Sequence, residues 1–184
     1  STNDEPCSAR SLTLGTSCSS ITGTTAGATS SAAPPAPTCG NHAGGDVWFS
    51  ATATALGGMV VRTSTVSGSP LTDAAMAVYS TTTCSGTLTE IACNDNIGAG
   101  TMPEVTLSGL SSGVTYYIRV WAVNNTTYGT FNICAIERRS NDEPCQATSV
   151  TVGSTCSFAS YSNVSATLTP DVGAPACGSL TGSS

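Results

Sequence analysis

Oxygen-bearing side chains suited to a metal ion are concentrated in Asn94-Asp95-Asn96, and Asp73 is expected nearby. Calcium takes about six to eight oxygen ligands, which carboxylates, Asn side chains and turn carbonyls can supply. With Asn at positions 94 and 96, such a site would carry little charge and bind weakly. The sequence therefore predicts either a weak calcium site or an Asx-rich turn whose side chains bond to their own backbone.

Catalytic residues are not predicted. His42 is the only histidine, so a metal site with two histidine ligands cannot be assembled, and we expect no histidine-based catalytic site. Glycosidases use two carboxylates flanking one bond, but the acidic residues here show no pairing in sequence. We therefore expect no enzyme activity. We also expect either no cofactor or calcium as the only one. The acidic candidates are Asp46, Asp73, Glu90, Asp95 and Glu104.

Composition excludes several classes of partner. The chain has 184 residues, a net charge of −6, five arginines and no lysine, which argues against nucleic-acid binding. No apolar run approaches the length of a membrane span of about 18 residues. The first residues, STNDEPCSAR, lack the basic and apolar parts of an export signal, so we expect a mature or excised chain.

The beginning of the sequence recurs later. Asn3–Cys7 (NDEPC) returns as 141–145, and the alignment of 3–46 with 141–184 continues without a gap, with 18 identities in 44 positions. Self-similarity at a fixed period indicates a modular array. We expect residues 1–138 to form a complete β-sandwich repeat and residues 139–184 to begin a second, homologous repeat of a longer polypeptide.

Nine cysteines without CxxC pairs predict disulfides in an oxidising, extracellular setting rather than a metal–thiolate site. Six of them fall in the first repeat and allow about fifteen pairings. Two of these cysteines are separated by the length of a tight hairpin, which favours one pair. Two others lie at the two ends of the repeat, and the ends of a domain often lie close together, which favours a second pair. The two cysteines that remain form the third pair. The expected pairs are Cys84–Cys93, Cys7–Cys134 and Cys18–Cys39, with Cys156–Cys177 in the second repeat and Cys145 left over.

Segments rich in Val, Ile, Thr and aromatic residues follow one another every 8–14 positions, separated by Gly, Ser and Asn turns. This spacing, with alternating apolar and polar residues, predicts an antiparallel β-sandwich. The expected strands are 47–54, 59–65, 75–80, 88–92, 104–110, 115–123 and 129–136, with one or two more near the start. The expected core is Trp48, Phe49, Tyr117, Ile118, Val120, Phe131 and Ile133. Parity places either Trp121 or Tyr117 on an outer face.

The motifs NDEPC, GGDVWFS, TDAAMAVYS, CSGTLTEIACNDN, TYYIRVW and GTFNICA together resemble the disulfide-bearing β-sandwich repeats of large secreted bacterial surface proteins. Such repeats are common in proteins exported by type IX secretion. The second half is also similar to the bacterial pre-peptidase C-terminal domain. The resemblance implies a jelly-roll-like sandwich, and some related modules bind calcium at the turn that corresponds to 94–96.

These features together predict a non-enzymatic structural or adhesive module of a cell-surface fibre or filament, extracellular and built from tandem repeats. The alternative is a carbohydrate- or protein-binding module appended to a secreted hydrolase; a protease-associated domain that is cleaved after export is a third hypothesis. Expected partners are adjacent repeats or further copies, and surface glycans or proteins. The expected interface between repeats comprises Arg138, Arg139, Asn141, Asp142, Glu143 and Pro144.

Overall fold

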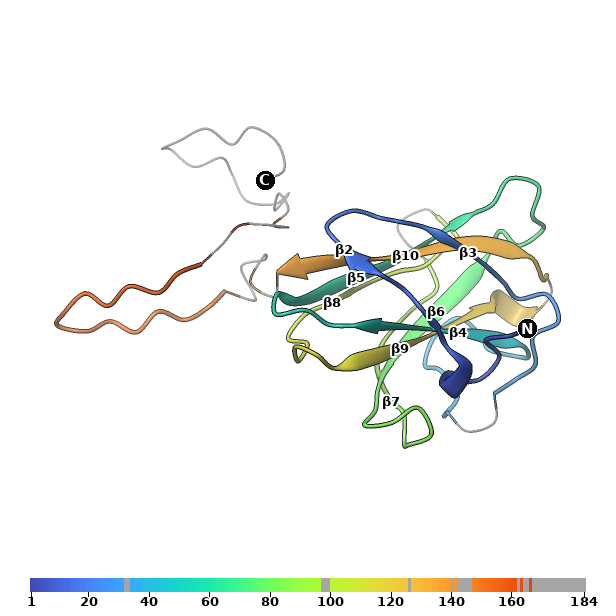
Figure 1. Ribbon diagram of the computed structural model, residues 1–184. Helices are drawn as coiled ribbons and strands as arrows, with labels where there is room; N and C mark the ends of the chain where they lie inside the picture. The colour runs from blue at the N-terminus through green and yellow to red at the C-terminus, as the bar shows by residue number, and fades with distance from the viewer. Residues whose placement is uncertain are drawn as a thin grey trace.

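The computed structural model describes residues 1–31, 34–96, 100–125, 127–139, 141, 147–161, 163 and 166. Ten strands and two short 3-10 turns make up the regular structure, so the predicted β-sandwich is confirmed (Figure 1). The elements are η1 (Pro6–Ser8), β1 (Arg10–Ser11), β2 (Leu14–Gly15), β3 (Ile21–Thr24), β4 (Asp46–Thr52), β5 (Gly57–Thr65), β6 (Ala74–Ser80), β7 (Thr89–Asn94), β8 (Glu104–Leu107), β9 (Thr115–Ala122), η2 (Val123–Asn125) and β10 (Thr130–Arg139).

Two sheets form the sandwich. The first has the strand order β1-β4-β9-β6-β7; the second has the order β2-β10-β5-β8, with β3 also paired to β10. Strands β4 to β10 coincide with the seven predicted segments to within a few residues at each end. The pairings are antiparallel except for two short parallel ones, β1 with β4 and β2 with β10. No helix in the described part of the chain is long and apolar enough to cross a membrane.

Alternation along the strands builds the core between the sheets. In β4, Val47, Phe49 and Ala51 face the core, and in β10 Phe131 and Ile133 do the same. All five are almost fully buried. The edge of one Phe ring meets the face of the other, with ring centres 5.9 Å apart between Phe49 and Phe131. This contact joins the first sheet to the second.

The N-terminal segment, from β1 to β3, closes the seam between the two sheets. β1 lies beside β4 in the first sheet, and the chain then crosses to the second sheet, where β2 and β3 lie beside β10. Gly23 of β3 is buried against both core phenylalanines. A Cβ atom added there would lie 2.8 Å from ring atoms of Phe49 and of Phe131, so only glycine fits without movement.

The chain enters and leaves the sandwich at opposite ends. The amino nitrogen of Ser1 donates to the carbonyl of Gly27 at 2.9 Å, and the amide of Thr25 donates to the carbonyl of Gly129, the residue before β10 begins. β10 then runs for ten residues to Arg139. At about 3.3 Å per residue, that distance is about 30 Å. Figure 1 shows the N-terminus at one end and the tip of β10 at the other.

Three disulfides hold the sandwich, but their pairing differs from the expected one. The bonds are Cys7–Cys84, Cys18–Cys134 and Cys39–Cys93. Each ties a segment that precedes β4 to a later strand or loop.

The expected pair Cys7–Cys134 is wrong because it assumed that the ends of the repeat lie together. The cysteine on β10 instead bonds to Cys18, in the turn between β2 and β3. Cys18–Cys39 is wrong because the two residues lie on opposite outer faces. Cys39 packs with residues on the outer face of the first sheet. Cys84–Cys93 is wrong because Cys93 lies near the far end of β7, opposite Ala77, whereas Cys84 lies in the loop that precedes the strand.

In the second repeat, Cys156 is exposed and has no disulfide partner among the residues that the structure describes. Cys145 and Cys177 lie outside the described residues, as do Asp142, Glu143 and Pro144 of the expected interface. Arg138 and Arg139 are the last residues of β10, opposite Gly58 and Gly57 of β5. The division into one complete and one partial repeat stays a prediction.

Candidate functional site

A second cluster of buried side chains lies on the outer face of the first sheet, beneath the loop that precedes β4. Trp48 of β4, Trp121 of β9 and Tyr79 of β6 are all inaccessible to solvent there. Trp48 is therefore buried as expected of a core residue, but in this second cluster rather than between the two sheets. The loop covers this face because Cys39 bonds to Cys93 of β7 and because the Trp121 indole donates to the carbonyl of Gly40 at 2.7 Å.

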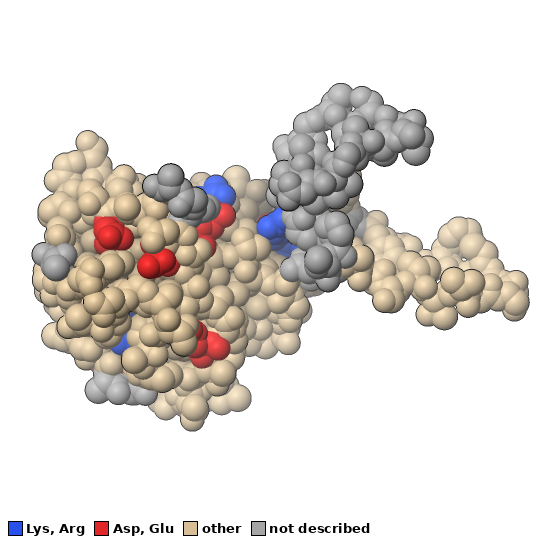
Figure 2. Space-filling view, turned by 180° about the vertical axis from the view of Figure 1, so that it is seen from behind, with Lys and Arg blue, Asp and Glu red and all other residues tan. Residues whose placement is uncertain are grey.

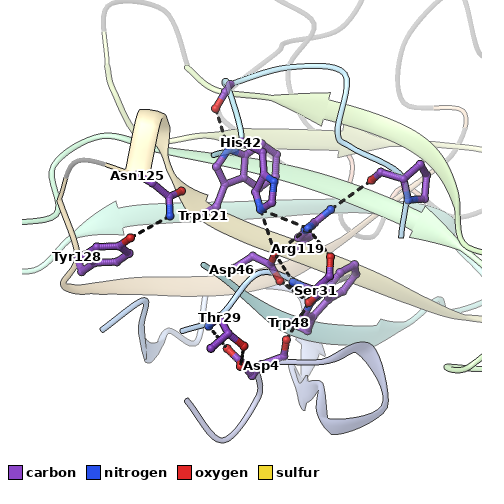
Figure 3. Close-up of polar contacts among 12 residues, drawn as sticks. Asp4, Thr29, Ser31, His42, Asp46, Trp48, Arg119, Trp121, Asn125 and Tyr128 are labelled. Atoms are coloured by element: carbon purple, nitrogen blue, oxygen red, sulfur yellow. Dashed lines mark hydrogen bonds and ion pairs between the residues drawn. The ribbon is translucent and has the colours of Figure 1, made fainter. Parts of the chain in front are cut away.

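Polar residues lie inside this cluster and form one network (Figure 3). Arg119 donates from a terminal nitrogen to Oδ2 of Asp46 at 2.7 Å, and both side chains are almost fully buried. Ser31 donates to Oδ1 of the same carboxylate at 2.6 Å. The indole nitrogen of Trp48 is 2.8 Å from that oxygen and 2.8 Å from the Ser31 hydroxyl. The guanidinium carbon lies 5.5 Å from the centre of the Trp48 ring.

His42 completes the network from the covering loop. Its Nε2 lies 3.0 Å from Oδ2 of Asp46 and 3.3 Å from a terminal nitrogen of Arg119. A carboxylate only accepts hydrogen bonds, so the contact with Asp46 requires a proton on Nε2. The imidazole ring also meets Trp121 edge to face, with ring centres 5.6 Å apart. Arg119 reaches the loop once more, at the carbonyl of Pro35, 3.2 Å away.

The network determines the charge state of its carboxyl group. Burial by itself would raise the pKa of Asp46, but hydrogen bonds from His42 and Ser31 and the charge of Arg119 outweigh burial and hold the pKa below its ordinary value. Asp46 is therefore ionised at neutral pH. Close by, burial raises the pKa of Tyr79, and the positive charge of Arg119 offsets only part of that rise. Among the residues that the structure describes, the Tyr79 hydroxyl and Nε of Arg119 have no hydrogen-bond partner, although both atoms are buried.

Ser31, His42 and Asp46 have the residue types of a hydrolytic triad, but the geometry differs from one. In a triad the histidine lies between the serine and the acid and removes the serine proton. Here the Asp46 carboxylate lies between Ser31 and His42 and bonds to both. The residues are also covered by the loop. The arrangement fits an ion pair that fastens the loop to the sheet.

The segment Gly109–Gly113 (GLSSG) has the letter pattern of a nucleophile elbow, which sequence reasoning passed over. In the structure it joins β8 of the second sheet to β9 of the first, rather than a strand to a helix. The backbone amide of Ser111 donates to the hydroxyl of Tyr116 at 3.1 Å. His42, the only histidine of the sequence, belongs to the network at the other end of β9, so it does not lie beside this serine.

The predicted calcium ligands are brought together only in part. Burial and the nearby charge of Asp95 both raise the pKa of Asp73, so the two carboxylates are neighbours. Asn94 is engaged elsewhere: its amide donates to the carbonyl of Glu104 at 2.9 Å, and its side-chain oxygen accepts from the amide of Asn96. Among the described residues, no three His, Cys, Asp or Glu side chains gather around one point. The Asx turn foreseen as the alternative is present.

The NDEPC motif binds within its own repeat. Asn3 accepts a backbone hydrogen bond from Trp48 and donates its side-chain amide to the Trp48 carbonyl. The Asp4 carboxylate accepts from the amide of Thr29 at 2.8 Å and also from its hydroxyl. The carbonyl of Asp4 lies 2.9 Å from the Ser31 hydroxyl oxygen. In the first copy, the motif therefore clamps the start of the chain to β4 and to the covering loop.

Sequence reasoning missed the buried network. Its members are far apart in the chain, since Asp46 and Arg119 lie on different strands, 73 positions apart in sequence. One signal was present: Arg119 is a charged residue inside an apolar strand, TYYIRVWA. A buried arginine needs a carboxylate to pair with its charge, so this residue could have predicted a buried acid on a neighbouring segment.

No protein-family model matches the chain, and no curated protein matches it significantly. Among solved structures, it is similar to the pre-peptidase C-terminal domain of a collagenase from Bacillus anthracis, with 12% sequence identity and a TM-score of 0.43. The match covers 69% of this chain and 93% of that domain. The resemblance of the sequence to repeats of secreted surface proteins stays a prediction.

Proposed function

We propose that this chain is a non-catalytic structural module of a secreted bacterial protein, one unit of a linear tandem array at the cell surface. The observation that carries the proposal is the position of the chain ends. Ser1 lies at one end of the sandwich and Arg139 at the other, about 30 Å away along β10. Copies joined in sequence would therefore extend in a line rather than fold back on one another.

The short junction between copies supports a stiff array. β10 ends at Arg139, and the second NDEPC motif begins at Asn141. One residue lies between them, and neither glycine nor proline occurs at the junction. A linker this short leaves neighbouring sandwiches little freedom to swing. Repeated head-to-tail contacts of one kind generate a filament.

The disulfides and the surface composition support an extracellular location for the protein. Three disulfides are typical of proteins in oxidising compartments. Few charged side chains are visible on the face that Figure 2 shows, and the Asp and Glu residues there are separated from one another. A cross-linked sandwich with little surface charge suits a load-bearing part better than an enzyme. The closed network around Asp46 supports the same proposal.

The array is tested on the secreted parent polypeptide by electron microscopy together with small-angle X-ray scattering. We expect rods with an axial repeat no shorter than about 30 Å per copy. Globular particles with one copy beside a catalytic domain would favour the appendage hypothesis instead. Beads that move freely about the junction would contradict a stiff array.

A second candidate function, ligand binding, is favoured by one cavity. The cavity measures about 490 Å³, is open to solvent and lies where β6 ends and β9 begins. Hydroxyl groups and one aromatic ring line it, and no charged side chain does. The lining residues are Thr81, Thr82, Gly113, Val114, Thr115 and Tyr117. One aromatic ring and neutral hydroxyl groups suit an uncharged saccharide, which matches the alternative of a carbohydrate-binding module.

Saccharide binding is tested by NMR titration of the full chain with neutral oligosaccharides. We expect shifts confined to the cavity and their loss in Thr82→Ala and Tyr117→Ala. Tyr128→Ala removes an exposed tyrosine near the opposite end of the sandwich and serves as the matched control. Shifts that persist in both cavity variants, or no shifts at millimolar saccharide, would contradict this second function.

A further inference from the structure

Residues 147–161 expose apolar side chains that a stable protein normally buries. The exposed fractions are 79% for Val150, 96% for Val152, 93% for Phe158 and 62% for Tyr161. No strand or helix forms in this segment, which projects away from the sandwich in Figure 1. Isolated apolar residues at a surface are ordinary, but four within twelve positions indicate a missing partner.

The first copy shows what the equivalent residues do. In the alignment of the two copies, Val150 corresponds to Leu12, which is buried in the core, and Val152 corresponds to Leu14, which packs against it. Cys156 corresponds to Cys18, which bonds to Cys134 of β10. Residues 10–24 of the first copy close the seam between its two sheets.

We propose that residues 147–161 are the seam segment of a second sandwich, and that they dock against β4-like and β10-like strands of that second copy, which follow position 184 in the same polypeptide. This inference rests on the tandem array proposed above. Val150 would face the core from beside the β4-like strand, as Leu12 does. Val152 would lie beside the β10-like strand, as Leu14 does.

The disulfide pattern of the first copy then assigns the partners of the remaining cysteines. The first-copy bonds span 77, 116 and 54 positions. Applied to the second copy, Cys145, Cys156 and Cys177 bond to cysteines near positions 222, 272 and 231. This assignment links none of the three to another and so differs from the expected pair Cys156–Cys177. Each bond arises by exchange with an oxidised thiol–disulfide oxidoreductase of the export compartment, which accepts two electrons and two protons from the two thiols.

Differences between the copies add two further requirements. Tyr161 replaces Gly23, which in the first copy has no room beside Phe49 and Phe131. The second copy therefore needs smaller residues near positions 187 and 269. Ser184 replaces Asp46.

Leu180 likewise replaces His42, so the second copy lacks both the carboxylate that accepts from the Arg119 guanidinium and the imidazole that contacts this carboxylate in the first. A buried arginine without its carboxylate is strongly unfavourable. We therefore expect an uncharged residue near position 257 of the second copy.

Non-reducing peptide mapping of the secreted parent polypeptide tests the assignment. We expect Cys145, Cys156 and Cys177 each linked to a cysteine beyond position 184, at the spacings above. The three first-copy bonds in the same digest are the matched control. A peptide joining Cys156 to Cys177, first-copy bonds other than those described, or a polypeptide without the later cysteines would each overturn the inference.

Hydrogen exchange provides a second measurement. In a chain extended through the second copy, amides of residues 147–161 should exchange at least about a hundredfold more slowly than in the chain that ends at Ser184. Val152→Asp should abolish this protection and leave the first copy unchanged, because Val152 is almost fully exposed in the shorter chain. Equal exchange in both chains would overturn the docking. Electron microscopy tests the tandem array independently of the disulfides. Rods together with a Cys156–Cys177 bond would therefore contradict this inference and leave the proposed array standing.

Discussion

Arg119 and Asp46 are 2.7 Å apart on two neighbouring strands of one sheet, and neither side chain is accessible to more than a trace of solvent. Together with His42 and Ser31 they fasten the loop before β4 over the outer face of the sheet. The pair faces the covering loop rather than the core between the sheets, where the apolar side chains of both sheets meet. Stability of the covering loop therefore depends on a buried pair of charges.

Removing one member of this pair should be strongly destabilising. Arg119→Met leaves Asp46 buried and without its cation, and we expect a loss of about 3–5 kcal/mol in the free energy of unfolding. Arg62→Met is the matched control, since Arg62 is half exposed and pairs with Glu104 at the surface. Its effect should stay below about 1 kcal/mol. Urea unfolding measures both, and equal losses would show that the buried pair has no special role.

Acid should weaken the protein through Asp46. Its pKa is depressed in the folded state relative to an ordinary value of 3.8, so its contribution to stability is complete above that value. As the pH falls through the ordinary value and then the folded-state pKa, the contribution is lost. We expect the gap in stability between the wild type and Asp46→Asn to be constant from about pH 7 to 5 and to shrink below about pH 4. A gap that is independent of pH down to about pH 2 would contradict an ionised Asp46.

Gly23→Tyr should destabilise the first copy, because the side chain meets both core phenylalanines. Overpacking of this kind costs about 1–3 kcal/mol or more. Phe131→Ala alone should cost about 3–5 kcal/mol by leaving a cavity. In the double variant the tyrosine fills part of that cavity, so the combined loss should be smaller than the sum of the two single losses. Thermal unfolding of the four proteins measures the coupling, and strict additivity would place the residue at position 23 away from Phe131.

Removing the charge of Asp73 should relieve its repulsion with Asp95 and stabilise the folded protein slightly. Because burial and the neighbouring charge raise the pKa of Asp73, its ionised form is disfavoured in the folded protein at neutral pH. Asp73→Asn should therefore raise the melting temperature slightly. The gain in the free energy of unfolding should be less than about 1 kcal/mol, since the site is largely solvated. Millimolar calcium should act in the same direction, and more strongly than magnesium. The calcium effect should vanish in Asp95→Ala; a calcium effect that persists there would place the ion elsewhere.

Much of the fold follows from local pattern. The segment 47–54, rich in Val, Thr and aromatic residues, predicted a strand, and β4 is that strand, with Val47, Phe49 and Ala51 facing the core between the sheets. The strands from β4 to β10 were predictable because each segment has a strand-like composition, several alternate, and turn residues separate them. The repeated NDEPC motif likewise predicts from the sequence alone that a second copy begins, since register over 44 positions needs no structure to detect.

Disulfide pairing and the buried network depended on tertiary structure. Cys18 bonds to Cys134 because the segment from β1 to β3 crosses from one sheet to the other, and Cys39 bonds to Cys93 because a loop folds over an outer face. Neither path of the chain can be predicted from the spacing of the cysteines in the sequence. Asp46 meets Arg119 for the same reason: the register between β4 and β9 places them on one face, and only the covering loop makes that face an interior. Contacts between distant residues are decided by how the chain crosses the sheets, which the local sequence pattern does not encode.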